Sequence, residues 1–116
     1  MNIEACYNKM GADYAEVKSR LPSDAFIKRF ALKFLDDPTF ALLEKSLAEE
    51  NVDEAFRAAH TLKGIRQNLG FSQLSPLAIE ITEILRAGTM DGVDTLFPQL
   101  KEKYDMTVAC IKEVDE

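Results

Sequence analysis

The chain has 116 residues, of which 47% are hydrophobic and 29% are charged, a composition that favours one folded domain with a single core over a disordered chain. Its 20 acidic and 14 basic residues leave a net charge of −6, which argues against binding to nucleic acid or to an anionic membrane surface. No segment has the pattern of a signal peptide or the length of a membrane span, and Cys6 and Cys110 form no metal-binding pattern, so we expect a cytoplasmic protein without a metal or cofactor of its own.

Apolar residues recur at helical spacing along almost the whole chain, and no segment shows the alternation typical of strands. Asp13 with Glu16 and Asn51 with Glu54 have the spacing of a capping box, and Ser23 and Asp37 occupy positions typical of helix N-caps. Gly11, Gly70 and Gly88 stand where helices would end. The predicted helices cover residues 2–10, 13–20, 23–36, 38–50, 52–69, 73–87 and 91–114.

The boundary at Pro38 leaves two interpretations open. Segments 23–36 and 38–50 are either separate helices or one helix kinked at Pro38, since proline removes a hydrogen bond without always ending a helix. In both cases the long amphipathic segments and short connections predict an all-α fold, an antiparallel four-helix bundle over residues 23–114. Residues 1–20 would add helices packed on this bundle, within a single domain of residues 1–116.

The only histidine of the chain, His60, lies in the middle of the predicted helix 52–69. Placed on a helical wheel at about 100° per residue, one face of this helix is apolar. That face comprises Val52, Ala55, Ala58, Ala59, Leu62, Ile65 and Leu69. Since His60 falls roughly opposite the centre of this face, the helix is predicted to present its imidazole to solvent.

Gly64 lies one turn after His60 on the same face, where a glycine costs roughly 0.5–1 kcal/mol relative to alanine. The functional reason we favour is access, because a helix surface without a side chain lets another protein approach the histidine. Lys63 brings a positive charge to the same place. An exposed neutral imidazole is a competent nucleophile near neutral pH, so a nucleophile beside a cation suits an anionic group such as phosphoryl.

The residues around His60 resemble those of the histidine-containing phosphotransfer (HPt) domains of two-component signalling. The matching pattern is H-x-L-K-G, formed by His60, Leu62, Lys63 and Gly64, followed by the triplet Asn68-Leu69-Gly70. The preceding segment FIKRFALKFLDDP is similar to the Phe-rich helix that usually comes before the histidine in this family. The resemblance covers roughly residues 13 to 114 and implies the four-helix bundle that the periodicity predicts independently.

This resemblance implies that His60 is a phosphoacceptor, with Lys63 neutralising the phosphoryl oxygens and Gly64 letting a partner dock. The implied partners are response-regulator receiver domains and a sensor histidine kinase. We expect the protein to act as a monomer that binds neither nucleic acid nor a membrane. The receiver would supply Mg²⁺ and its own lysine. We therefore expect a phosphocarrier that takes part in His–Asp transfer without an ATP-dependent catalytic site, which leaves its status as an enzyme open.

Other positions have expected roles beside His60 or depart from the family pattern. Gln67 shares the histidine face and is a candidate hydrogen-bond donor to the phosphoryl group or the imidazole, while Phe56 and Arg57 are candidates for partner docking. Arg66 replaces the small residue usual in the family, and its guanidinium must extend to solvent or pair with an acid. Thr82 stands where many family members have a glutamate.

Three functions compete at this stage. The first is a carrier in a multistep phosphorelay, which accepts phosphoryl from a receiver aspartate and passes it to another receiver. The second is the phosphoacceptor domain of a chemotaxis-type histidine kinase, which would carry the same H-x-L-K-G pattern. The third is a non-catalytic helical adaptor, which the joint presence of His60, Lys63 and Gly64 disfavours.

Overall fold

The computed structural model describes residues 1–114, all of whose regular elements are helices. The helices are α1 (Ile3–Met10), α2 (Tyr14–Arg20), α3 (Asp24–Phe34), α4 (Thr39–Ala48), α5 (Val52–Leu69), the 3-10 turn η1 (Ser72–Leu74), α6 (Ser75–Arg86) and α7 (Val93–Lys112). The all-α prediction is confirmed, and the predicted ends of the helices agree to within about two residues. The last two residues of the predicted domain, 115–116, lie outside the described part.

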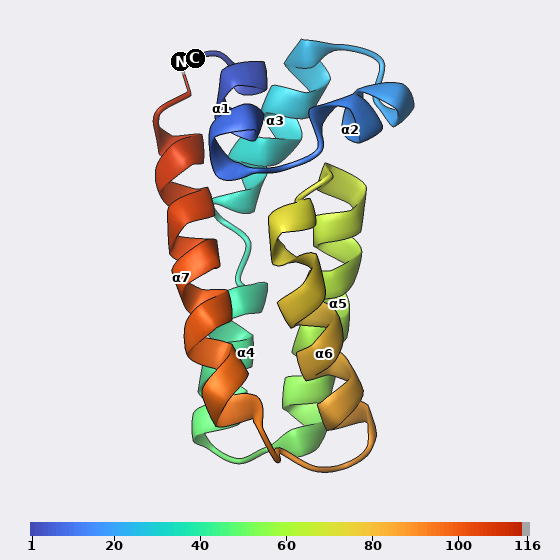
Figure 1. The fold of residues 1–116 in the computed structure, drawn as a ribbon, viewed down its shortest axis with the longest axis vertical. Helices are drawn as coiled ribbons and strands as arrows, with labels where there is room; N and C mark the ends of the chain where they lie inside the picture. The colour runs from blue at the N-terminus through green and yellow to red at the C-terminus, as the bar shows by residue number, and fades with distance from the viewer. Residues whose placement is uncertain (115–116) are drawn as a thin grey trace.

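Helices α4 to α7 form an antiparallel bundle along the long axis of the molecule, which measures 40 × 23 × 19 Å (Figure 1). Consecutive helices of the bundle pack side by side, and an aromatic cluster fills the space between α4 and α7. In that cluster Phe40 stacks on Phe97 with ring centroids 5.4 Å apart and on Tyr104 with centroids 3.9 Å apart. None of the helices within residues 1–114 is long and apolar enough to cross a membrane.

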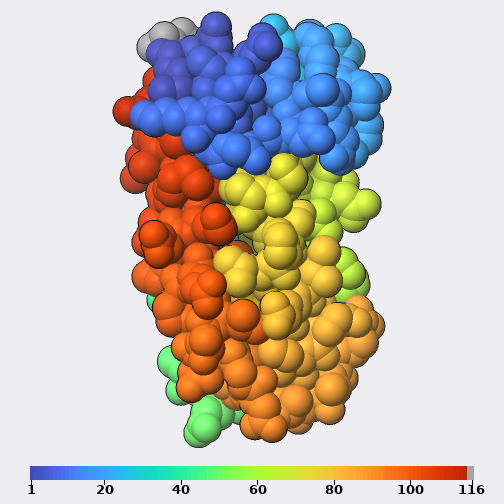
Figure 2. Space-filling view, in the orientation of Figure 1, coloured from blue at the N-terminus to red at the C-terminus, as the bar shows by residue number. Residues whose placement is uncertain are grey.

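The helix is interrupted between α3 and α4, so segments 23–36 and 38–50 are two separate helices and not one kinked helix. The proline ring cannot continue the hydrogen-bond ladder, and the Asp37 carboxylate accepts a 2.8 Å hydrogen bond from the amide of Thr39. The Asp37 carboxylate thus binds the first amide of α4, but Pro38 and not Asp37 occupies the N-cap position, one residue later than predicted. Helix α3 is a separate helix. It packs with α1 and α2 across the end of the bundle, where it also contacts α5 and α7 (Figures 1 and 2).

Side-chain caps fix the starts of α2, α3 and α5, as the sequence predicts. Oxygens of Asp13, Ser23 and Asn51 accept hydrogen bonds from backbone amides three residues later, at 3.0, 3.3 and 3.2 Å. Each bond lies within four residues of sequence, so capping is determined locally. These caps decide where the helices begin and thereby which residues of each helix share a face.

The N-terminal helices hold the carboxyl end of α5, the helix that carries His60. Tyr7 of α1 donates a 2.6 Å hydrogen bond to the carbonyl oxygen of Leu69, and burial raises the pKa of its phenol. Arg20 of α2 donates to the carbonyl oxygens of Gln67 and Asn68 at 2.5 and 3.1 Å. The last carbonyls of a helix lack partners further along it, and the Gln67 carbonyl accepts only a long 3.4 Å bond from the amide of Gly70, so α1 and α2 complete the last turn.

Gly70 ends α5 with a left-handed backbone, φ +70°, and its carbonyl accepts a 2.9 Å hydrogen bond from the amide of Asp13. A Cβ at this position would lie 2.8 Å from the carbonyl oxygen of Asp13. We expect Gly70→Ala to lower the free energy of unfolding by about 2–4 kcal/mol, as backbone strain and this clash add. Urea unfolding followed by circular dichroism measures the change.

Gly88 provides the matched control for this prediction. Its φ of +83° is equally unfavourable for alanine, but a Cβ there would meet no atom within 4 Å. Gly88→Ala should therefore show the backbone strain alone, about 1 kcal/mol. Equal losses for the two variants would contradict a tight contact between Gly70 and the α1–α2 connection.

Candidate functional site

Helix α5 presents His60 to solvent, as the wheel predicts. Its buried side comprises Ala55, Ala58, Ala59, Leu62 and Leu69. His60 itself is exposed. Two residues that the wheel assigns to the apolar face, Val52 and Ile65, are only half-buried, because they lie at its edges. The imidazole is thus accessible from outside the bundle.

Gly64 opens the surface beside the imidazole. It is exposed within α5, and a Cβ built on it would find no heavy atom within 4 Å beyond the helix itself. Packing within residues 1–114 therefore gives no reason for a glycine at this position. Because the helix would be more stable with almost any other non-proline residue there, the structure agrees with a surface kept bare for an approaching partner.

Phe56 connects the histidine to the neighbouring helix α6. Its ring centroid lies 5.8 Å from that of the His60 imidazole, with the planes tilted by 47°. The guanidinium carbon of Arg86 lies 5.1 Å from the centre of the Phe56 ring, in a cation–π arrangement. Phe56 is half-buried and packs against the core, so only part of its ring is available for the docking role that the sequence suggests.

Glu83 of α6 lies close enough to His60 and Lys63 to interact with both. Its carboxylate accepts a 2.9 Å hydrogen bond from Nε of Arg86, which is the main reason that the pKa of Glu83 falls below its ordinary range. The nearby Lys63 and His60 lower this pKa as well. Lys63 is half-buried, so part of its stem is packed while its charge acts on this cluster.

Neither Glu83 nor Arg86 emerges from the sequence as a site residue. The family pattern draws attention to Thr82, but Thr82 is fully buried and donates a 2.6 Å hydrogen bond to the carbonyl oxygen of Ala78. The acidic side chain that reaches the site is the next residue along the chain. The available signal was the short connection between α5 and α6, which brings position 83 level with position 60 in an antiparallel pair.

The other candidate residues lie at varying distances from the imidazole. Arg57 is exposed, and its guanidinium makes a long ion pair with the carboxylate of Glu54, at 3.8 Å. The charge of Arg57 therefore remains accessible to solvent. Gln67 is exposed two turns after His60, and no hydrogen bond within residues 1–114 joins its side chain to the ring. Arg66 is half-buried, and its Nε atom is buried without a hydrogen-bond partner in the described part of the chain.

No cluster of three or more histidine, cysteine, aspartate or glutamate side chains in residues 1–114 is arranged to hold a metal ion. The residues gathered around His60 are instead cations, an aromatic ring and two carboxylates, Glu54 and Glu83, each paired with an arginine. Of the three cations at this surface, Arg57 pairs with Glu54 and Arg86 with Glu83, while Lys63 forms no ion pair of 4 Å or less within residues 1–114. The charge of Lys63 favours an anionic group beside the nucleophile His60.

Comparison with known proteins agrees with this arrangement. The model of the family described as Hpt domain matches residues 37–109, which include the whole of α4, α5 and α6. The chain is similar to the chemotaxis protein CheA of Halobacterium salinarum, with 36% identity over 69 residues. This match spans 57% of the chain and a tenth of the length of that relative. No solved structure was found to match.

Proposed function

Because the chain belongs to the Hpt domain family, we propose that it is a histidine phosphotransfer protein of a multistep two-component phosphorelay. His60 accepts a phosphoryl group from a receiver-domain aspartate and passes it to the aspartate of another receiver. The observation that carries this proposal is the exposed imidazole of His60 beside the bare surface of Gly64.

The transfer needs one nucleophile from this chain. The lone pair of the unprotonated ring nitrogen attacks phosphorus while the bond from phosphorus to the aspartate oxygen breaks, and the electron pair of that bond returns to the carboxylate. The proton on the second ring nitrogen can then pass to water. In the reverse reaction the ring takes this proton back, a second receiver carboxylate attacks phosphorus, and the electron pair of the breaking nitrogen–phosphorus bond returns to the ring, which restores the neutral imidazole.

Positioning and charge neutralisation carry most of the catalysis in such a step. Lys63 lies one turn after His60 and brings a cation toward the phosphoryl oxygens. The receiver is expected to hold Mg²⁺, which offsets the charge on the same oxygens. Each partner thus contributes part of the site, and the complete site forms only when the two surfaces meet.

Lys63→Ala is expected to slow transfer by about ten- to a hundredfold, because a cation near the phosphoryl group is lost. The helical circular-dichroism signal should not change, since no hydrogen bond or ion pair of Lys63 within residues 1–114 supports the fold. The rate is measured with a phosphorylated receiver in single-turnover experiments. Lys103→Ala, which removes an exposed cation from α7, should transfer at the parent rate. Loss of helical signal in Lys63→Ala would instead assign the lysine a structural part.

The proposal is tested by incubating the protein with phosphorylated receiver domains of the source organism. The expected product carries phosphate that is labile in acid and stable in base, as a phosphorus–nitrogen bond requires. Profiling every receiver in this way also identifies the fastest partner. The absence of label with every phosphorylated receiver would refute the phosphorelay function.

The similarity to CheA supports a second candidate, the phosphoacceptor domain of a chemotaxis-type histidine kinase. In that case a kinase domain with ATP would label His60 directly, faster than any phosphorylated receiver. A non-catalytic adaptor would accept phosphate from neither source. We further propose that the protein acts as a cytoplasmic monomer, which light scattering coupled to size exclusion would test.

A further inference from the structure

The two cysteines of the chain, which the proposed function does not use, lie at the interface between α1 and α7. Cys6 is on α1 and Cys110 on α7, two helices that pack against each other, and both side chains are buried free thiols (Figure 1). Three residues further along each helix, Lys9 and Glu113 form an ion pair of 2.9 Å across the same interface. Residues roughly a hundred positions apart in the chain thus meet here.

This environment protects the two thiols for as long as α1 stays in place. Burial above all, and then the neighbouring Cys110 and Glu113, raise the pKa of the Cys6 thiol to about 11. Charges act on one another in this way only over short distances, which agrees with two adjacent thiols. Because peroxides react with the thiolate and not with the thiol, a buried thiol whose pKa is raised reacts slowly.

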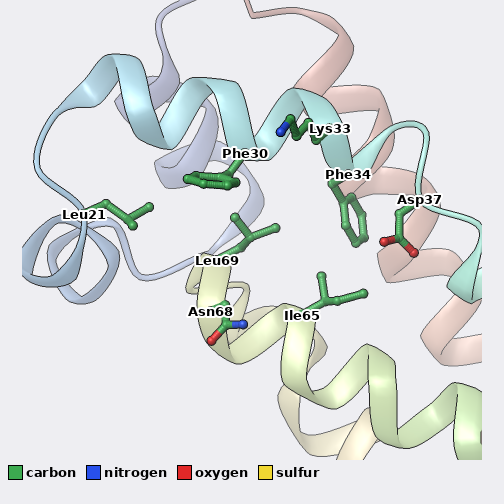
Figure 3. A pocket seen from close by; sticks show the side chains of 8 residues that line it. All are labelled: Leu21, Phe30, Lys33, Phe34, Asp37, Ile65, Asn68 and Leu69. Carbon is green, nitrogen blue, oxygen red and sulfur yellow. The ribbon is translucent and has the colours of Figure 1, made fainter.

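Helix α1 attaches the N-terminal helices to the bundle through buried side chains. Ile3, Cys6 and Met10 are all buried, whereas α3 leaves a groove of about 350 Å³ toward α5 (Figure 3). Phe30 and Leu69 lie on opposite walls of this groove and do not close it. A bond between α1 and α7 therefore acts where the N-terminal helices already meet the bundle through their core.

Opening of α1 would expose both sulfur atoms. The helix has eight residues, and a helix shorter than about 12 residues is marginal on its own in water. Its polar contacts with the bundle include the exposed Lys9–Glu113 pair and the hydrogen bond from Tyr7 to the carbonyl of Leu69. When these contacts separate, α1 loses its support, and local opening of this kind needs less free energy than unfolding of the whole domain.

We propose that opening of α1 exposes Cys6 and Cys110 to hydrogen peroxide, which converts them to an intramolecular disulfide that fixes α1 on α7. One thiolate attacks a peroxide oxygen, the oxygen–oxygen bond breaks, and the departing hydroxide takes the proton that the thiol has lost; the product is a sulfenic acid and water. When α1 closes, the second thiolate attacks the sulfenic sulfur, and hydroxide leaves with the second thiol proton as water. Two thiols and one peroxide thus give one disulfide and two waters.

The disulfide acts on stability and not on the chemistry of His60. A covalent bond between residues roughly a hundred positions apart restricts the unfolded chain, and the effect grows with the length of the enclosed loop. Cys6 is adjacent to Tyr7, whose hydroxyl binds the last turn of α5, so the bond also fixes the end of the helix that carries His60. We therefore expect a reversible stabilisation under oxidising conditions.

The test treats the whole protein with hydrogen peroxide and then measures its mass and its thermal unfolding. The expected product is a monomer that has lost two hydrogens, has no thiol left for iodoacetamide after denaturation, and yields a peptide that joins Cys6 to Cys110. Its Tm should rise by about 10 °C, and dithiothreitol should reverse the rise.

Four outcomes of this experiment would each overturn the proposal. They are thiols that remain free, sulfinic or sulfonic acids without a disulfide, a disulfide between two molecules, and a linked monomer that unfolds at the parent Tm. The parent protein therefore decides the result without any substitution.

Cys6→Ala and Cys110→Ala are the matched controls, because each leaves one thiol and all the methionines. Neither should form an intramolecular disulfide, and peroxide should not raise the Tm of either. A rise in Tm equal to that of the parent would show that oxidation stabilises the protein at another site and would overturn the proposal.

Two further variants test whether α1 must open. Lys9→Ala removes the ion pair with Glu113 and should speed disulfide formation about threefold, because α1 then opens more often. Direct attack on the closed pair would become slower instead, since Lys9 lowers the pKa of Cys6. Lys101→Ala removes a similarly exposed pair with Glu44, between α4 and α7, and should keep the parent rate. No acceleration in Lys9→Ala, or equal acceleration in Lys101→Ala, would overturn the proposal.

Discussion

His60→Gln is expected to abolish labelling by a phosphorylated receiver completely. Glutamine has a side chain of similar polarity but no basic nitrogen, so no phosphorus–nitrogen bond of the required kind can form. Because His60 is exposed and Phe56 is the only ring that it contacts within residues 1–114, the substitution should leave the bundle intact. The measurement is the radioactive phosphate retained on the protein after denaturing electrophoresis at alkaline pH.

The composition of the chain makes this result decisive. His60 is the only histidine among the 116 residues, so label that is stable in base and labile in acid has no second imidazole to occupy. Circular dichroism and urea unfolding serve as the control for folding, with changes within about 0.5 kcal/mol expected for an exposed position. If His60→Gln accepted phosphate as well as the parent, the assignment of the phosphoacceptor would be wrong.

Gly64→Gln is expected to change stability and transfer in opposite directions. Replacing a glycine inside α5 should raise the free energy of unfolding by about 0.5 kcal/mol, since glutamine favours the helix and finds open space. The same side chain projects beside the imidazole and should obstruct the receiver. We expect kcat/KM for transfer to fall about a hundredfold, with labelling by phosphoramidate nearly unchanged because that donor is small.

Gly64→Ala is the matched variant for this experiment. It should gain as much stability as Gly64→Gln or more, while its single methyl group obstructs the receiver much less, so that kcat/KM falls by no more than about tenfold. Together the two variants show whether the loss of transfer grows with the size of the side chain at position 64. If Gly64→Gln were more stable than the parent and transferred phosphate at the parent rate, access could not be the reason for the glycine.

The comparison of Gly64 with Gly70 shows how two glycines of one helix can have different purposes. Gly70 has a positive φ and a backbone oxygen 2.8 Å from the place of a Cβ, so the fold itself requires it. Gly64 has neither a positive φ nor a neighbour, so the fold does not. Sequence position alone suggested this difference, since one glycine ends a helical pattern and the other interrupts it.

The predictions that succeeded from the sequence rest on interactions between residues close in the chain. The helix ends at Asp13, Ser23, Asn51 and Gly70 depend on hydrogen bonds that span three to five residues. The exposure of His60 follows from the 3.6-residue period of a single helix. Both kinds of interaction can be read from a short window of sequence, whatever the rest of the molecule does.

The features that could not be predicted from the sequence depend on how one helix is placed against another. The periodicity fixes the direction of each side chain from its own helix axis, but not the rotation and offset of the neighbouring helix. Glu83 and Arg86 come to the site because α6 packs on α5 in one particular register, which exposes position 83 and buries Thr82. A shift of one residue would exchange these roles.

The sequence by itself determined that this protein is helical, that its single imidazole points outward, and that a glycine and a lysine lie one turn away, because these properties follow from local spacing. Only the tertiary structure decided that Tyr7 and Arg20 complete the end of α5 and that α3 and α5 enclose a groove. Those contacts join residues more than thirty positions apart. They result from the packing of the whole core, in which many weak contacts together select one arrangement.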